Sequence, residues 1–526
     1  MANFETVEVT TDLLIVGGGM AACGAAVEAA YWAKKNGVKV VMVDKAATDR
    51  SGAVAMGLSA VNQYIGMAEG DNTPDDYVDY VRQDLMGVCR EDLVYNIARH
   101  VDSTVHLFEK WGLPIWKDEN GKYVHEGRWQ IMINGESYKV IVAEAAKNAL
   151  KTLGNLDEIL YERVFIVEPL LDGDRIAGAV GFSVREEKFY VFKAKAVLVA
   201  MGGAVHVFRP RSTGEGLGRS WYPPFNTGSS AYFTIKAGAE MTCQEVRFIP
   251  VRFKDGYGPV GAWFLLFKSI ATNAFGSDYM VAYPEELEKR APYGTTKPIP
   301  ACLRNHLGML DLFGGKGPIY MQTADAIKRI AESAPDEKAA KRKLKELEAE
   351  AWEDFLDMTI TQSMLWAATN VEPEKKPSEI APCEPYFIGS HSGASGAWVS
   401  GPEDVAPPEY NWGYCNMATV KGLFCAGDAS GASSHKFSSG SCTEGRIASK
   451  SAIRYILENP EQPNVDMAQV EELKKKILKP LDLFREHSGM SSDPNINPNF
   501  IKPKDFMFRL QKIMDEYAGG VTMHFT

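Results

Sequence analysis

A glycine-rich turn near the N-terminus has the spacing of a dinucleotide-binding loop. Gly17, Gly19 and Ala22 form a G-x-G-x-x-A motif directly after an apolar run. In this motif the first glycine permits a tight turn, the second lets the backbone approach a pyrophosphate, and the small third residue keeps helix and strand close. The N-terminus of the following helix supplies N–H groups and a positive dipole end. Asp44, after the next apolar run, is placed to accept hydrogen bonds from ribose hydroxyls.

The elements that must position this motif are predicted on both sides of it. Residues 13–16 and 38–43 are short apolar runs typical of buried parallel strands. The alanine-rich residues 21–33 between them predict a helix, which ends at Gly37. Strand, helix, second strand and acid follow in the expected order, which favours a dinucleotide site over a purely structural glycine turn. The motif alone does not distinguish FAD from NAD.

A second loop rich in small residues follows the motif. Residues 45–66 are nearly uncharged after Arg50, so they can run tight against a flat cofactor. A plain buried loop would have the same composition. Asn62 is the polar group of this loop that is most able to contact a ring or a substrate.

Two later stretches favour FAD. Residues 172–204 predict a β-meander that returns to a buried strand and a turn at Gly202, a pattern typical of flavoproteins with two dinucleotide-binding domains. Residues 422–456 predict a short strand, then Gly427 and Asp428, then a helix with small residues at its N-terminus. The positive end of such a helix stabilises an anionic reduced flavin.

Changes in character along the chain predict its domains. With 526 residues the chain is too long for a single core. The fold class is α/β, or α+β overall, and the FAD-binding domain is Rossmann-like. We expect its two parts at residues 1–248 and 387–464, an inserted capping domain at residues 249–386, and a helical C-terminal region at residues 465–526.

Composition argues against several functions and locations. The net charge of −11 argues against a nucleic-acid-binding surface. No apolar run reaches the roughly 18 residues that a membrane-spanning helix needs, so no membrane span is expected. The N-terminus is polar and acidic and does not read as a secretory signal. A cytoplasmic location is therefore expected.

The cysteine pattern argues against metal centres in this chain. The eight cysteines are scattered, and none forms a C-x-x-C pair. Iron–sulfur and structural zinc sites usually have closely spaced cysteines, so no metal or cluster is expected here. Buried, reduced thiols are the favoured interpretation.

Taken together, these motifs resemble one family. The chain is similar to the alpha, FAD-binding subunits of dissimilatory adenylylsulfate (APS) reductase, within the fumarate reductase and succinate dehydrogenase flavoprotein superfamily. The resemblance covers nearly everything from Asp12 to Tyr517. Family chains continue into a longer helical region, so the C-terminal region is expected to be truncated. The strings that carry the resemblance are DRSGAVAMGLSAVN, GRWQIMINGESYK, RPRSTGEGLGRSWY, RFKDGYGPVGAWFLLFK, IPACLRNH, LWAATN, IGSHSGASGAW and HKFSSGSCTEGR.

The resemblance implies a reaction and a partner. APS and two electrons are interconverted with AMP and sulfite, and sulfite is carried as an adduct at N5 of the flavin. The electrons come from a small iron–sulfur beta subunit, ferredoxin-like, with two [4Fe–4S] clusters. That division of labour agrees with the scattered cysteines of this chain.

The resemblance also implies site residues. Arg252 and His391 match the pair nearest the sulfate, where an arginine fork holds anionic oxygens and a histidine donates to sulfate or moves a proton. Structural roles, such as an ion pair for an arginine or core packing for Trp221, are the alternatives. The roles of Arg128 and Glu136 stay unassigned. The implied substrate-contacting set is Asn62, Trp221, Phe264, Leu265 and Arg304.

The flavin is expected to be bound without a covalent link. In respiratory succinate dehydrogenases a flavin-linking histidine follows an Arg-Ser pair, and here Gly52 follows Arg50 and Ser51. The predicted cofactor-binding set is Gly17, Gly19, Ala22, Asp44, Lys45, Ser51, Gly52, Ser59, Val164, Gly202, Asp428, Ser438 and Ser441.

Two rival functions share this fold. One is oxidation or reduction of dicarboxylates or aspartate, but the H-T-x-G-G type of dicarboxylate-binding string is not found. The other is a flavin-carrying electron-transfer or assembly subunit without substrate chemistry, against which the presence of both Arg252 and His391 argues. The sequence does not indicate the physiological direction of the reaction.

Overall fold

The computed structural model describes residues 4–58, 60–183, 185–211, 222–358, 360–383, 386–387 and 394–519. Its centre is a five-stranded parallel sheet with the order β20-β11-β2-β3-β7. The strands predicted at residues 13–16 and 38–43 are confirmed within two residues as β2 and β3. The strands are β2 (Leu13–Val16), β3 (Val40–Asp44), β7 (Leu160–Glu162), β11 (Ala196–Val199) and β20 (Leu423–Cys425).

The central sheet is apolar on both faces because both faces are covered. Leu13 and Ile15 of β2 belong to a core with helices α1 (Met20–Asn36), α4 (Tyr138–Lys151) and α13 (Phe437–Glu458). Leu14 and Val16 point to a second core, shared with a four-stranded sheet. Continuous apolar runs are the usual sequence of such doubly covered parallel strands.

Two strands of the predicted β-meander, β9 and β10, belong to a four-stranded sheet with the order β1-β10-β9-β8. Strand β8 precedes the predicted stretch, and β1 is added from the N-terminus in parallel to β10. Helix α6 lies beside β8. The bounds are β1 (Glu5–Thr10), β8 (Val164–Asp172), β9 (Arg175–Ser183), β10 (Lys188–Lys193) and α6 (Ser229–Ala237).

Helix α1 confirms the predicted helix and ends as expected. Gly37 closes it in the left-handed conformation with φ 67°, which glycine adopts without cost. The helix also packs unusually close to α13. A Cβ at Gly24 would lie 2.2 Å from the carbonyl oxygen of Cys442, and one at Gly445 would lie 1.9 Å from that of Ala21. The backbones of α1 and α13 are therefore in direct contact near the start of α13.

A small helical and sheet layer covers one side of the cofactor-binding part. Helix α4 begins at Tyr138, and both Tyr138 and Lys139 are buried. The short helix α5 (Leu156–Ile159) leads from α4 into β7. The elements of the layer are α2 (Pro74–Asp84), α3 (Glu91–Lys110), β4 (Ala60–Asn62), β5 (His125–Glu126) and β6 (Gln130–Met132).

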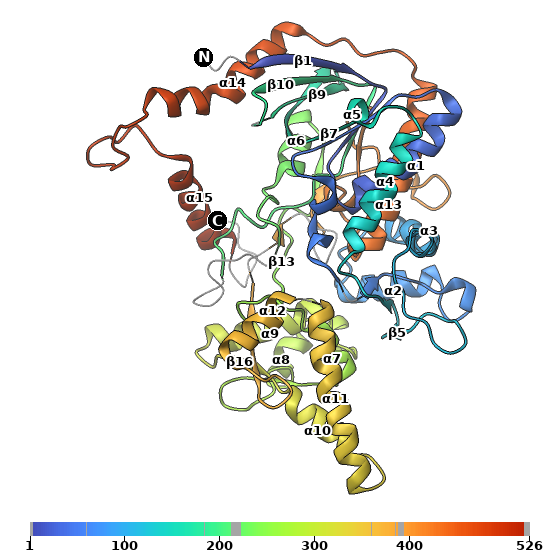
Figure 1. Ribbon diagram of the computed structural model, residues 1–526, viewed down its shortest axis with the longest axis vertical. Helices are drawn as coiled ribbons and strands as arrows, with labels where there is room; N and C mark the ends of the chain where they lie inside the picture. Colours follow the sequence, from blue (N-terminus) through green and yellow to red (C-terminus); the bar gives the residue numbers. More distant parts are fainter. Residues whose placement is uncertain are drawn as a thin grey trace.

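The middle of the chain forms a separate body at one end of the molecule (Figure 1). Its own core includes Trp263, Phe267 and Ile380. Its sheet has the order β14-β17-β16-β15. Its elements are β14 (Val251–Phe253), α7 (Gly261–Leu266), β15 (Ala271–Thr272), α8 (Pro284–Glu288), α9 (Ala301–Phe313), β16 (Ile319–Met321), α10 (Thr323–Glu332), α11 (Glu337–Met358), α12 (Ile360–Thr369) and β17 (Ser378–Pro382).

Two short ladders pair the segment that enters this middle body, which we call the cap, with the segment that leaves it. The strands of each ladder are far apart in the chain, so the two connections to the cofactor-binding part run side by side. They are β12 (Met241–Thr242) with β19 (Gly396–Ala397), and β13 (Arg247–Phe248) with β18 (Tyr386–Phe387).

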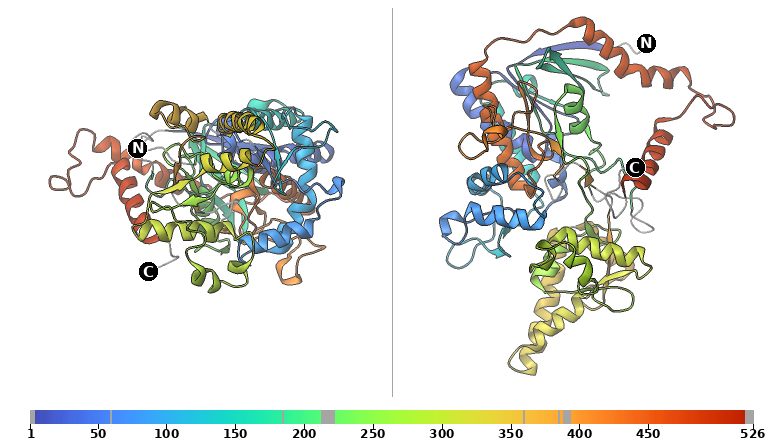
Figure 2. Two further views of the ribbon diagram at one scale, coloured as in Figure 1. Left: turned by 90° about the horizontal axis from the view of Figure 1, so that it is seen from below. Right: turned by 180° about the vertical axis from the view of Figure 1, so that it is seen from behind.

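The C-terminal helices form an arm on one side of the body (Figure 2). Helix α14 (Met467–Glu486) lies in the predicted helical region, runs on through Pro480, and packs Val470 and Leu478 on the four-stranded sheet. Helix α15 (Pro503–Ala518) touches the body where Gln511 donates to the carbonyl of His206 at 2.9 Å. Among the helices that the structure describes, none is both long and apolar enough to span a bilayer.

Candidate active site

A cleft of about 500 Å³ lies where the central sheet meets the cap. Val16, Asp44 and Ala200 bring the carboxyl ends of β2, β3 and β11 to its wall, and Arg252 and Arg304 reach it from the cap. Ligands of open α/β sheets bind at this edge of the strands. One continuous cleft therefore joins the dinucleotide motif to cationic side chains that are far away in the sequence.

The phosphate end of the cleft is built from glycine backbone. Gly17 has φ +128°, and a Cβ there would lie 2.1 Å from the carbonyl oxygen of Ala200. Gly52 has φ +82°, and its Cβ would lie 2.9 Å from the Cα of Gly19. Gly19 is also the N-cap of α1 and caps it with no side chain, so the first N–H groups of the helix remain for a ligand.

Beside the glycine backbone, the cleft has a carboxylate with one oxygen that lacks a partner. Asp44 is 4% exposed, and its Oδ2 has no hydrogen-bond partner among the described residues. Burial raises the pKa of Asp44, against hydrogen bonds from Ser51 and the Ala46 backbone and the charge of Lys139. A buried acceptor at this place fits a ribose hydroxyl donor, as the sequence predicts for the adenosine half of FAD.

Two lysines flank this carboxylate. Lys45 lines the cleft, where its Nζ donates to the carbonyl of Phe225 at 2.5 Å and lies 4.9 Å from the ring centre of Phe165. Burial lowers the pKa of Lys45 to about 8, although Asp44 opposes the shift. Lys139 is buried behind the wall and donates to the carbonyl of Thr48. Lys139 ends the GRWQIMINGESYK string, and the sequence predicts no role for it.

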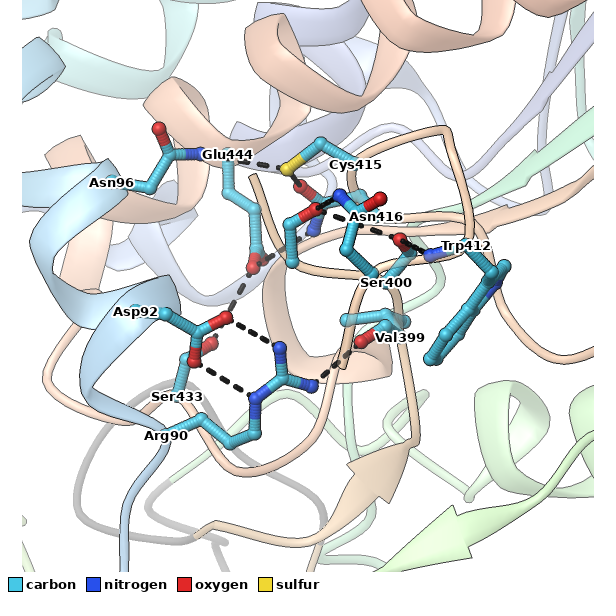
Figure 3. A network of polar contacts seen from close by, with 12 residues as sticks. Arg90, Asp92, Asn96, Val399, Ser400, Trp412, Cys415, Asn416, Ser433 and Glu444 are labelled. Carbon is cyan, nitrogen blue, oxygen red and sulfur yellow. Dashed lines mark hydrogen bonds and ion pairs between the residues drawn. The ribbon is translucent and has the colours of Figure 1, made fainter. Parts of the chain in front are cut away.

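The far wall of the cleft is the start of α13, which carries Glu444. Figure 3 shows Glu444 with two of its partners, Asn416 and Ser433. Glu444 Oε2 accepts from the backbone N–H of Gly427 at 2.6 Å and lies 2.9 Å from Lys436 Nζ. Its Oε1 accepts from Asn416 Nδ2 at 3.1 Å and Ser433 Oγ at 3.4 Å. Every one of these groups is buried, so the network holds the turn at Gly427 and Asp428 against the cleft.

Most predicted cofactor residues meet in this cleft. Ala22 does not line the cleft. It lies in the core behind the cleft wall, which suits the packing position that the motif gives it. Ser59 lies outside the described residues. The predicted residues that line the cleft are Gly17, Gly19, Asp44, Lys45, Ser51, Gly52, Val164, Gly202, Asp428, Ser438 and Ser441.

Two cations of the cap reach the side of the cleft opposite the glycine backbone. Arg252 lies on β14, and burial lowers the pKa of its guanidinium. Arg304 lies on α9, and its guanidinium is 4.7 Å from the ring centre of Phe264. Leu265 lies in α7 beside Phe264, but its side chain is not described, and Trp221 and His391 lie outside the described residues.

Three polar side chains cross the small sheet in one row. Asn62 of β4 pairs with Gln130 of β6, which pairs with Glu126 of β5, and all three line the cleft. Asn62 Oδ1 and Glu126 Oε1 are buried with no hydrogen-bond partner in the described part of the chain. Burial raises the pKa of Glu126 to about 7. Only Asn62 of this row was predicted as a site residue.

Three further cleft residues were not predicted from the sequence. Tyr80, Asp84 and His435 line the cleft and come from the end of α2 and from the HKFSSGSC string. Such residues carry no local signal, because only the tertiary fold brings them to the cleft. Of the two unassigned residues, Arg128 pairs with Asp76 at 3.0 Å on the surface, and Glu136 is exposed.

The described residues contain no cluster suited to a metal ion. No group of three or more His, Cys, Asp or Glu side chains in the described part of the chain could hold one. All eight cysteines are free thiols, and burial raises the pKa of several of them, including Cys89, whose pKa is about 11.

Comparisons with known proteins agree with this geometry. Residues 12–258 match the family model described as FAD binding domain. The chain is 51% identical to the adenylylsulfate reductase subunit alpha of Megalodesulfovibrio gigas, over 99% of this chain and 81% of that protein. The solved adenylylsulfate reductase of Archaeoglobus fulgidus is similar with a TM-score of 0.92 at 58% identity, covering 99% of this chain and 81% of that one.

A second solved structure bears on the chemistry. It is an adenosine-5-phosphosulfate reductase in complex with sulfite as a covalent adduct, similar with a TM-score of 0.92 at 58% identity over 98% of this chain and 80% of that one. Sequence identity of this extent covers nearly the whole chain. Together with a cleft that joins a dinucleotide cradle to two arginines, it identifies the family. The chain belongs to the alpha subunits of adenylylsulfate reductase, a family of FAD-binding oxidoreductases.

Proposed function

We propose that this chain is the FAD-containing catalytic subunit that interconverts APS and two electrons with AMP and sulfite. The observation that carries the proposal is the single cleft in which the cradle at Gly17, Gly19 and Asp44 continues to Arg252 and Arg304. APS has a sulfate and a phosphate, so a site for it needs cations beside a redox cofactor. The dicarboxylate chemistry of the rival function lacks the support of a relative of comparable identity and coverage.

FAD supplies the two-electron chemistry at sulfur when it is bound, and the residues of this chain hold and orient the reactants. The glycine backbone and the free N-terminus of α1 bind the pyrophosphate, and Asp44 accepts from the ribose. Arg252 and Arg304 offset the negative charge of the sulfate and phosphate, which otherwise repels an electron-rich flavin. Asn62 offers an amide at the same wall.

The finer parts of the proposal come from the resemblance. FAD is held without a covalent bond, because Gly52 stands where related dehydrogenases carry a flavin-linking histidine. The electrons come from an iron–sulfur beta subunit with two [4Fe–4S] clusters, and the complex is cytoplasmic. His391 joins Arg252 near the sulfate, and Trp221, Phe264 and Leu265 shape the channel. The domain boundaries at residues 248, 386 and 464 remain part of this proposal.

The decisive experiment is an assay of APS-dependent AMP formation with the beta subunit present and absent. We expect AMP and sulfite in equal amounts when the beta subunit and a reductant are present. Bleaching of the bound flavin by sulfite alone is expected from the alpha chain by itself. Turnover of fumarate or succinate, with none of APS, would instead support the dicarboxylate oxidoreductase.

A further inference from the structure

The end of helix α2 carries a buried carboxylate that faces two distant parts of the chain. Asp84 is 7% exposed. Its Oδ1 accepts a hydrogen bond from the backbone N–H of Ala301 at 2.6 Å, and its Oδ2 lies 2.8 Å from Nε2 of His435. Ala301 belongs to the cap and His435 to the segment that leads into α13. One side chain thus joins the two walls of the cleft.

On the cap side, Asp84 replaces a missing helix cap. Helix α9 begins at Ala301 after Pro300, and no side chain of its own caps it. A carboxylate at the first N–H groups satisfies an orphan donor and favours the positive end of the helix dipole. The contact is reinforced by Gln83, whose Nε2 donates to the carbonyl of Tyr293 at 3.2 Å, and by Cys302, whose Sγ donates to the carbonyl of Asp84 at 3.2 Å.

On the flavin side, the structure holds His435 in place. Its side chain is 2% exposed, its carbonyl accepts from the hydroxyl of Tyr77 at 2.8 Å, and its ring centre lies 5.4 Å from that of Tyr80. Burial would raise the pKa of Asp84, but His435, the Ala301 N–H and Arg304 together hold it below its ordinary value. The carboxylate therefore stays charged between its two partners.

We propose that Asp84 is a positioning residue for the reaction, because it holds α9 against the flavin-side wall and so fixes Arg304 over the cleft. Arg304 follows Ala301 by one helical turn, and its guanidinium is held on the other side by the ring of Phe264. The proposal rests on the proposed function for the role of Arg304 toward APS. An error of about 1 Å in the position of such a group can cost about a hundredfold in rate.

The test is a double-mutant cycle in the holoenzyme with its beta subunit. Asp84→Ala is expected to lower kcat/KM for APS roughly ten- to a hundredfold, mostly through KM. In an Arg304→Ala background the same change is expected to cost less than about twofold, because coupled residues are not additive. Asp84→Asn keeps an acceptor for the Ala301 N–H and should recover part of the loss. An equal loss in both backgrounds would overturn the proposal.

Controls separate positioning from folding. Asp79 lies on the same helix, is exposed and pairs with Arg82. The control variant Asp79→Ala is therefore expected to leave turnover unchanged. Flavin content and bleaching by sulfite should be unchanged in Asp84→Asn. If Asp84→Ala does not fold, Asp84→Asn takes its place in the double-mutant cycle. Amide hydrogen exchange should quicken in the first turn of α9 in the Asp84 variants. Unchanged exchange there overturns the proposal, whereas a wild-type enzyme without APS turnover counts against the proposed function.

Discussion

At the scale of single residues, the proposed reaction places its largest demand on Arg252. Removing one preorganised donor commonly costs about 10²–10³ in rate, or ~3–4 kcal/mol. We expect Arg252→Ala to lose turnover of APS to this extent while it keeps its FAD, because β14 is not part of the dinucleotide cradle. Arg252→Lys should recover only part, since an ammonium lacks the planar fork. Steady-state kinetics beside flavin absorbance measure both effects.

The matched control for this change is Arg128→Ala, which removes an arginine on the surface. It should keep near-normal turnover. His391→Ala is expected on sequence grounds to behave like Arg252→Ala. Near-normal turnover of Arg252→Ala at full flavin content would remove the assigned role from Arg252.

Glu126 should make substrate binding depend on pH. Burial raises its pKa to about 7 from an ordinary 4.5, so the carboxyl is mostly neutral below that pH and ionised above it. Ionisation adds a negative charge to a cleft that receives an anion, and the affinity for AMP should therefore fall as pH rises from about 6 to about 8. The same raised pKa means that Glu126 contributes less to stability as pH rises through about 7.

Glu126→Gln removes this titration and should flatten the pH dependence of AMP affinity. Titration calorimetry at several pH values measures it. Glu136→Gln is the matched control, because Glu136 is exposed, and it should keep the slope of the wild type. A slope that survives in Glu126→Gln would assign the pH dependence to another group.

At the scale of elements, the start of α13 depends on a buried ion pair. Lys436 and Glu444 are almost fully buried, with 2.9 Å between Nζ and Oε2. Removing one partner of such a pair usually costs ~3–5 kcal/mol, because the other charge stays buried. Glu444→Ala should therefore lower the free energy of unfolding by about this amount and weaken FAD binding, since Gly427 loses its acceptor.

Urea unfolding and the release of FAD on dilution test this prediction. Glu458→Ala is the control on the same helix, where an exposed pair with Arg454 is worth about 0–1 kcal/mol. If Glu444→Ala and Glu458→Ala lose equal stability, the network does not support the wall of the cleft.

At the scale of the whole molecule, FAD should be held by shape and hydrogen bonds alone. The cradle is closed by Gly19 and Gly52, and no side chain fits at Gly52 because its Cβ would lie 2.9 Å from the Cα of Gly19. Acid precipitation of the protein should therefore release the yellow colour into the supernatant. Colour that stays with the precipitate would show a covalent bond and contradict the prediction.

The cleft is formed by two bodies, the cap and the cofactor-binding part. The cap has its own core around Trp263, and the cofactor-binding part has separate cores on the two faces of the central sheet. The cleft lies where these bodies meet, and Asp84 joins them by accepting a hydrogen bond from Ala301. The part of the cleft that the cap contributes therefore depends on how the two bodies are joined.

The sequence by itself determined the parts of this protein that local physics controls. The apolar runs of β2 and β3, the helix between them and the left-handed Gly37 follow from residue type and spacing. The same holds for the cradle at Gly17 and Gly19 and for Asp44, because a βαβ unit places its own motif within one short segment. The family followed from long strings, and the comparisons confirm it.

Only the tertiary structure decided which distant residues share the cleft. Glu126 faces it because three short strands pair in one register, and Asp84 joins Ala301 to His435 across hundreds of residues. The contact of α1 with α13 at Gly24 was likewise absent from the sequence expectations. Local patterns carry no information about such pairs, because long-range packing decides which surfaces meet and how much of each polar group water can still reach.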